Sequence, residues 1–269
     1  MVRKLFKHEM IAYLRVWIPM QIILMAVACS VRILQFFESD STAYSIVNGT
    51  SVLLYFLTVI ASLGLTLVFG IVRFYKNLFS NEGYLSFTLP VTTTQHIFSK
   101  VLSAGIFMIF TYVSVLISAL IVSSGELLSG IMQDLGDFWT EGYALAGSNL
   151  IFYVIEALLV LCVVTFTQFL LYYTCIALGQ LFRKNRVIGA VVVYFIYYVI
   201  SQAIGTIFVI FVSLAAESQW IARITQYFTS HVFGSIHLFL CGSIVLELLL
   251  ATLYYFITHT VIRKKLNLE

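Results

Sequence analysis

Three ionisable side chains lie inside long apolar stretches of this 269-residue sequence: Arg32, Glu156 and Glu247. Charged groups are costly within hydrocarbon, so such residues mark either a buried pair or a path for a solute. Arg32 and Glu156 lie toward the outer ends of their stretches, where a long side chain can reach the polar interface. Glu247 lies near the middle of the last stretch and needs a cation or hydroxyl partner if it is charged, Arg32 being one candidate. Packing and transport roles both stay open for these residues.

Two polar stripes follow helical spacing within apolar stretches. The first comprises Tyr55, Thr58, Ser62 and Thr66, and the second comprises Tyr194, Tyr198, Ser201, Gln202 and Gly205. Such faces are disfavoured toward lipid, so each is expected to face protein or a water-filled path. Tyr55, Ser62, Tyr198 and Gln202 therefore join the three ionisable residues as candidate pathway residues. Hydroxyls and tyrosines without a fixed charge suit an amphipathic or peptide-like cargo better than a small ion.

Catalytic and cofactor motifs are absent from the sequence. It contains neither H-E-x-x-H nor G-x-S-x-G, and no glycine directly precedes a lysine, so the phosphate-binding motif G-x-x-x-x-G-K-[ST] is missing. The four cysteines lie in apolar stretches without metal-ligand or disulfide spacing. We therefore expect no enzyme, no metal site, no cofactor held by this chain and no nucleic-acid partner.

Long apolar helices must position these side chains. Hydrophobic residues make up 61% of the sequence and charged residues 10%, with a mean hydropathy of +1.01, whereas soluble domains carry about 25% charged residues. A bilayer needs about 20 apolar residues per helix. An all-α integral membrane protein is predicted, with six spans at about 16–37, 51–72, 101–122, 150–182, 187–216 and 232–262.

Basic residues orient the spans. Six spans place both termini on one side of the membrane. Of the 15 Lys and Arg residues, 13 fall on that side. They lie before the first span, between the second and third spans, between the fourth and fifth spans, and after the last span. Most acidic residues fall on the other side. By the positive-inside rule both termini are cytoplasmic.

Three segments outside the spans are expected at the membrane surface. Residues 2–17 predict an amphipathic helix at the cytoplasmic interface. Residues 123–149 predict an acidic helix on the outer surface, and residues 217–231 resemble a second interfacial element.

The cytoplasmic segment 73–100 is far longer than a tight helical hairpin requires. It contains side chains too apolar to face water without a partner, namely Phe74, Tyr75, Leu78, Phe79, Tyr84, Leu85, Phe87 and Leu89. Gly83 marks a turn and Pro90 a break, and Thr92 with Gln95 predicts a capping box that opens the third span.

The run Glu82-Gly-Tyr-Leu-Ser-Phe-Thr-Leu-Pro-Val-Thr, followed by Gln95 and Ser99-Lys100, resembles the loop after the second span of the ABC-2 type transporter permeases, the transmembrane subunits of bacterial ABC exporters. The resemblance extends to the layout of the whole chain. It implies a single permease domain over residues 1–269 and a coupling helix that docks on a nucleotide-binding subunit. The coupling residues it implies are Phe74, Tyr75, Leu78, Phe79, Glu82, Gly83, Tyr84 and Leu85.

The resemblance further implies an exporter in the bacterial cell membrane, built from two permease chains, identical or similar. A separate ATPase subunit would bind ATP and Mg²⁺. Two other classes stay open: an ion-coupled carrier or channel, for which six spans and Glu247 suffice, and a membrane anchor or assembly protein that does not transport.

Overall fold

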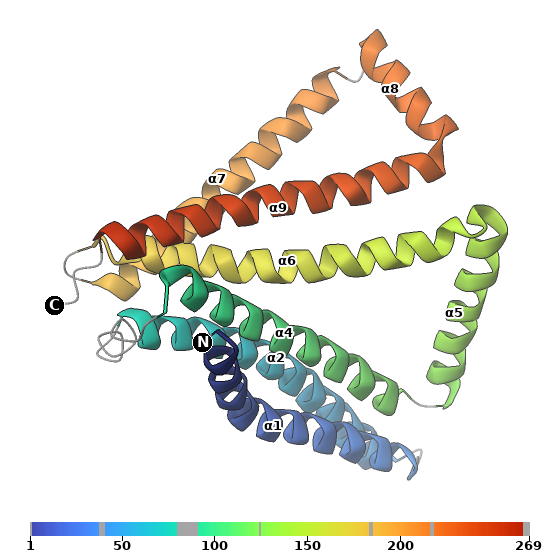
Figure 1. The fold of residues 1–269 in the computed structure, drawn as a ribbon. Helices are drawn as coiled ribbons and strands as arrows, with labels where there is room; N and C mark the ends of the chain where they lie inside the picture. Colours follow the sequence, from blue (N-terminus) through green and yellow to red (C-terminus); the bar gives the residue numbers. More distant parts are fainter. Residues whose placement is uncertain are drawn as a thin grey trace. The chain divides into compact units, whose positions relative to one another are not determined.

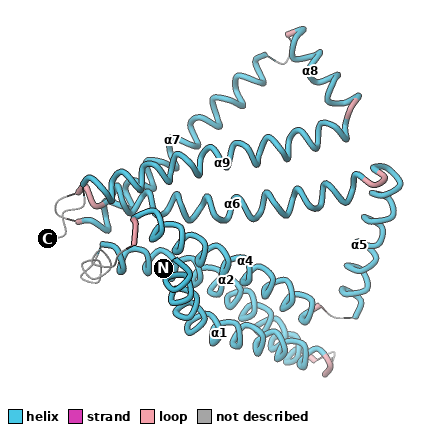
Figure 2. Tube along the Cα trace, viewed as in Figure 1, coloured by secondary structure: helices cyan, strands magenta, loops and turns pink. Residues whose placement is uncertain are grey.

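The computed structural model describes residues 2–37, 41–79, 91–123, 125–182, 185–215 and 218–265. These residues form eight helices and no strand (Figures 1 and 2). The helices are α1 (Val2–Gln35), α2 (Thr42–Phe79), α4 (Thr93–Val122), α5 (Gly125–Ala146), α6 (Asn149–Gly179), α7 (Arg186–Ala215), α8 (Gln219–Ser230) and α9 (Val232–Lys265). Six of them, all except α5 and α8, are long and apolar enough to cross a membrane. This confirms the predicted all-helical class with six candidate spans and indicates a multi-pass membrane protein.

The chain divides into two compact units, an N-terminal unit (Met1–Leu145) and a C-terminal unit (Ala146–Glu269). In the N-terminal unit α1 lies parallel to α4, because Glu9 contacts Lys100 and, farther along, Trp17 contacts Thr111. Helix α2 runs antiparallel to both. Leu24, Ala28, Val31 and Tyr55 form one core cluster. Each unit contains three long helices, and the single permease domain over residues 1–269 stays a prediction.

Rings fill the other part of the N-terminal core. Tyr13 of α1 stacks on Phe107 of α4, with ring centroids 5.0 Å apart, and meets Phe69 of α2 edge to face. Trp17 packs against the same Phe107, and its indole N–H donates to Thr111 at 2.9 Å. Aromatic pairs of this geometry add stability beyond the apolar area that they bury.

In the C-terminal unit α6 and α9 are parallel and keep a constant register. Tyr153 donates to the Phe233 carbonyl, Thr167 to that of Glu247, and Thr174 to that of Tyr254, each pair 80 residues apart. The ladder runs from near the start of α6 to near its end. Leu171, Cys175 and Tyr254 form the core where Tyr197 of α7 also packs.

Helix α7 touches this pair only near its first turns. A Cβ on Gly179 would come within 2.5 Å of the Ala190 backbone nitrogen, and one on Gly189 would meet the Phe182 ring. These two glycines allow a close crossing. Beyond it α7 separates from α9, and α8 joins their far ends (Figure 1). Gly189 is the one buried residue of α7.

Helix boundaries differ from the predicted spans. Helix α1 is continuous from Val2 to Gln35, so the predicted amphipathic segment and the first span are one helix, with Pro19 inside it. Proline removes a hydrogen bond to the preceding turn and bends a helix, and the first turns of α1 do run at an angle to the rest (Figure 1). That the first turns of α1 lie at the cytoplasmic interface stays a prediction. The predicted capping box at Thr92 and Gln95 is confirmed, and α5 confirms the helix predicted in residues 123–149. Residues 217–231, predicted as an interfacial element, contain the helix α8.

Candidate functional site

One buried carboxylate joins the three long helices of the N-terminal unit. Glu9 of α1 is 4% exposed. Its Oε1 accepts a hydrogen bond from Lys100 Nζ of α4 at 2.7 Å, and its Oε2 pairs with Arg73 Nε of α2. Asn77 Nδ2 donates to the same Oε1 at 3.4 Å. We call Glu9, Arg73, Asn77 and Lys100 the Glu9 cluster.

The burial of this cluster makes it sensitive to change. Lys100 is 3% exposed, whereas Arg73 keeps about a quarter of its side chain accessible. Removing one member of a buried ion pair leaves the other charge uncompensated, which costs far more than the pair contributes. The cluster therefore fixes the relative positions of α1, α2 and α4 in one geometry.

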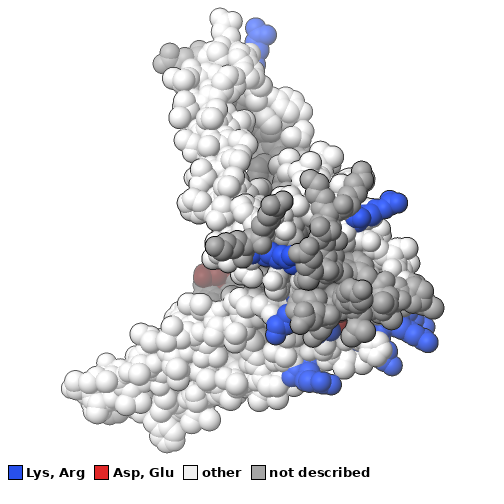
Figure 3. All heavy atoms as spheres, turned by 90° about the vertical axis from the view of Figure 1, so that its left-hand side faces the viewer, with Lys and Arg blue, Asp and Glu red and all other residues white. Residues whose placement is uncertain are grey.

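Arg73 and Lys100 are also the two ends of the predicted coupling segment. Both cations bind the same carboxylate, so Glu9 holds the base of the segment together. In Figure 3, Lys and Arg side chains are visible at several places on the face turned toward the viewer, and few acidic side chains are visible there. Among the described residues, Glu9 is the carboxylate that binds both cations.

Half of the predicted coupling residues lie on the last two turns of α2. Phe74, Leu78 and Phe79 are buried within the chain, while Tyr75 is half-buried and stacks with Phe79 at 6.5 Å. Glu82, Gly83, Tyr84 and Leu85 lie outside the described residues. Among the described apolar side chains that the sequence assigns to a docking contact, Tyr75 is therefore the one that a partner could reach.

The reason is a continuous buried face on α2. Ser62, Thr66, Gly70, Phe74 and Leu78 recur every four residues, and all five are buried. Residues four apart lie on the same side of a helix. The predicted polar stripe and the predicted docking residues thus belong largely to one packed surface.

Side chains of the α2 stripe bind other helices of their own unit. The Tyr55 hydroxyl lies 3.0 Å from Ser118 Oγ, and the Ser62 hydroxyl accepts from Gln21 Nε2 at 3.5 Å. Thr66 and Thr111 share a hydrogen bond at 3.1 Å. Of the two readings that the sequence leaves open for this stripe, these contacts favour helix packing.

The polar stripe of α7 is arranged differently. Tyr198 is 56% exposed and Gln202 is exposed, as are Ser201 and Gly205. In contrast, Tyr197 on another face of α7 accepts a hydrogen bond from the Tyr254 hydroxyl at 2.9 Å. Within the C-terminal unit the stripe is thus exposed, and so are the other α7 residues from Tyr198 to Leu214.

Glu156 has a partner that the sequence did not indicate. Both of its carboxylate oxygens contact His237 Nδ1, at 2.8 and 2.9 Å, and the Cys241 thiol lies 3.9 Å from Oε1. The Tyr153 ring packs on His237, with centroids 4.3 Å apart. The constant 80-residue register of α6 and α9 brings them together, and only knowledge that these two spans pack as neighbours would have revealed it. In the described part of the chain, no three His, Cys, Asp or Glu side chains are arranged to hold a metal ion.

Glu247 and Arg32 have fewer polar contacts. Glu247 Oε2 is buried and makes no hydrogen bond to any described group. Arg32 donates to Gln35 at 3.4 Å, and its guanidinium lies 4.9 Å from the centre of the Phe36 ring. The described contacts of Arg32 are therefore local, and its predicted pairing with Glu247 stays a prediction.

Comparisons with known proteins give no further guide to the site. No protein-family model matches the chain, and no curated protein or solved structure matches it significantly.

Proposed function

We propose that this chain is the permease subunit of an ATP-driven exporter of the ABC-2 type, with a separate nucleotide-binding subunit as its energy source. The observation that carries the proposal is the construction of segment 73–100. Its two ends, Arg73 and Lys100, bind one buried carboxylate on a third helix. A force applied to a segment anchored in this way reaches α1, α2 and α4 together, which is what coupling to a partner that changes state requires.

The uncovered stripe of α7 supports assembly with a second permease chain. Gln202 and Ser201 are exposed on α7, and the residues directly before and after this pair are apolar. Amide and hydroxyl groups are costly against lipid and stabilise contacts between helices. A second copy or a similar chain at this face would bury them, or enclose a polar path for an amphipathic or peptide-like cargo.

An experiment on the intact complex tests the proposal. The tagged chain is purified in detergent from the membrane of its host, the accompanying subunits are identified by mass, and ATP hydrolysis is measured. We expect a stoichiometric ATPase subunit. A chain that purifies without one, and under conditions that preserve other membrane complexes, contradicts the proposal.

A surface variant then tests the coupling assignment. Tyr75→Glu places a charge on the accessible side of the α2 end, so we expect loss of the ATPase subunit or of its stimulation, with insertion into the membrane unchanged. Tyr143→Glu changes the same residue type on exposed α5 and is the matched control. Equal behaviour of the two variants would remove the coupling role of Tyr75.

An ion-coupled carrier is the second candidate, and it has an observation in its favour. The C-terminal unit holds a His237–Glu156 pair and a buried, unpartnered carboxylate oxygen on Glu247. Groups of this kind form proton relays in transporters. Transport driven by a proton gradient in the absence of ATP would favour this candidate over the exporter, and a chain that moves no solute under either condition would favour the anchor or assembly class.

A further inference from the structure

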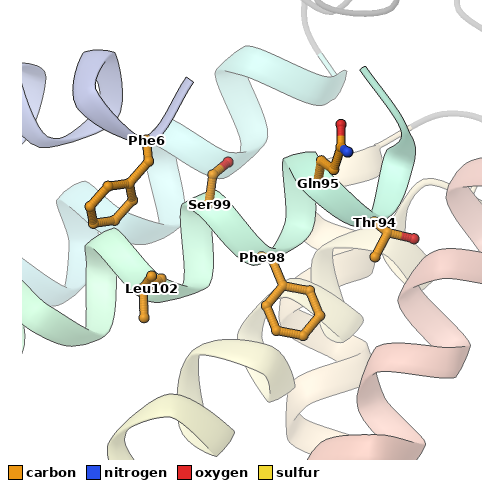
Figure 4. Close-up of a pocket in the computed structure, with 6 residues that line it drawn as sticks. All are labelled: Phe6, Thr94, Gln95, Phe98, Ser99 and Leu102. Atoms are coloured by element: carbon orange, nitrogen blue, oxygen red, sulfur yellow. The ribbon is translucent and has the colours of Figure 1, made fainter. Parts of the chain in front are cut away.

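A groove of about 320 Å³ opens between the first turns of α1 and α4. Its walls are Phe6 of α1 together with Thr94, Gln95, Phe98, Ser99 and Leu102 of α4. In Figure 4 the Phe6 ring points from α1 toward α4, and Leu102 and Phe98 lie along the same side of α4. Phe98 and Leu102 are 61% and 44% exposed, so the apolar part of the groove is accessible within the N-terminal unit.

Two polar groups of the groove already have hydrogen-bond partners inside the chain. The Ser99 hydroxyl donates to the His96 carbonyl at 3.0 Å, and the Gln95 side chain accepts from the Thr92 backbone N–H in the capping box. A peptide backbone laid in the groove would need partners for its own N–H and C=O groups. An aliphatic chain has no such need, so the walls suit an acyl chain better than a peptide.

The rim of the groove is basic. Arg3 precedes Phe6 by three residues and neighbours it on the surface of α1, and Lys7 follows Arg3 by four residues and neighbours Arg3 in turn. Both are exposed. The one acidic residue of α1, Glu9, is buried against Arg73 and Lys100, and α4 has no acidic residue. Nothing in the sequences of these two helices offsets the positive charge beside the groove.

We propose that this groove binds an anionic phospholipid, with an acyl chain along Phe6, Phe98 and Leu102 and the phosphate beside Arg3 and Lys7. Basic amphipathic helices and basic pockets at span ends recruit anionic headgroups, and each nearby cation strengthens binding about fivefold. A neutral lipid would make the apolar contacts of the groove but no ionic contact with Arg3 and Lys7. A soluble anion would make the ionic contacts but would leave the apolar walls empty. The proposal does not depend on the transport function of the chain.

The test uses the full chain in detergent and native mass spectrometry. The probes are phosphatidylglycerol and phosphatidylcholine with identical acyl chains, added at equal concentration. We expect phosphatidylglycerol to bind at least fivefold better. Arg3→Gln should lose about fivefold of that binding. Lys4→Gln is the matched control, because it removes the same charge from the same helix but is two residues from Phe6, on another face.

A second pair of variants tests the groove itself. Leu102→Trp fills it and should lower binding of both lipids several-fold. Phe110→Trp enlarges an exposed side chain of the same helix outside the groove, and should change neither. The Arg3 and Lys4 comparison stays informative even if Leu102→Trp fails to fold, since both cations are on the surface.

Three results would overturn the proposal. Equal binding of the two lipids would remove the role of the charge. Equal losses in Arg3→Gln and Lys4→Gln would mean attraction to the helix as a whole and no defined site. Protection of a Phe98→Cys thiol from alkylation in lipid-free detergent would mean that another part of the chain fills the groove.

Discussion

Glu9 is one of the most constrained single residues in the described chain. Its two carboxylate oxygens accept from side chains on two other helices, and neither it nor Lys100 has more than a few per cent of its surface exposed. Replacing such a pair by apolar groups of similar volume is often neutral, whereas removing one partner is strongly destabilising. The cluster therefore specifies how three helices fit, and its net contribution to stability is best measured by comparing single and paired changes.

We predict that Glu9→Ala lowers the free energy of unfolding by about 3–5 kcal/mol, because it leaves Lys100 buried without its counterion. Glu9→Met combined with Lys100→Met should recover much of the loss. Unfolding in detergent by heat or denaturant gives the comparison. Glu141→Ala, an exposed change on α5, is the control and should cost less than about 0.5 kcal/mol. A Glu9→Ala chain as stable as the control would contradict the structural role of the cluster.

Glu156 and Glu247, the two described carboxylates of the C-terminal unit, should respond in opposite ways to the same change. Glu247→Leu removes a buried oxygen that has no partner, so stability should stay equal or rise by about 1 kcal/mol. Glu156→Leu removes the partner of His237 and should lower stability by about 1 kcal/mol, reduced by the partial exposure of both groups. Thermal unfolding of the two variants measures the difference. A large loss in Glu247→Leu would show that its carboxylate has a partner after all.

At the scale of elements, the crossing of α6 and α7 depends on two glycines. The Gly179 Cα faces the backbone of Ala190, so there is no flexible side chain that could move aside for a larger residue. Small residues at such points let helices approach closely, and packing replaces the missing hydrophobic drive within lipid. The rest of α7 makes few contacts in its unit, so its angle depends heavily on this crossing.

We therefore expect Gly179→Ala to destabilise the C-terminal unit by about 1–3 kcal/mol, the usual cost of overpacking. Gly242→Ala on α9 of the same unit is the matched control, since a Cβ there meets nothing within 4 Å. That control should be neutral or slightly stabilising, because alanine favours helix by up to about 1 kcal/mol. Melting temperatures in one detergent compare them. Identical shifts for the two variants would exclude a tight crossing at Gly179.

At the scale of the whole molecule, each unit contributes three long helices whose first and third members are parallel. A chain that crosses a membrane three times ends on the side opposite to the one where it began. If both termini are cytoplasmic, as the basic residues predict, the N-terminal unit ends outside and the C-terminal unit begins there. The acidic helix α5 would then join the units on the outer side.

The uncovered α7 stripe gives a prediction for assembly. In a background without native cysteines, Gln202→Cys should cross-link to a second permease chain in membranes. Ile200→Cys is two residues away, on the opposite side of α7, and is equally exposed to the reagent within the unit. It should cross-link much less. Equal cross-linking of both positions, or of neither, would contradict a defined contact through the stripe.

The sequence by itself determined the helical class, the six long apolar helices, the capping box at Thr92 and the helix in residues 123–149. These features depend on local composition and spacing, which neighbouring residues decide. Only the tertiary structure decided which polar residues meet. The pairs Glu9 with Lys100 and Glu156 with His237 are 91 and 81 residues apart, and no local pattern connects them. The burial of Phe74 and Leu78 within the chain could not be predicted either, because an apolar helix face looks the same in the sequence whether its own chain or a partner covers it.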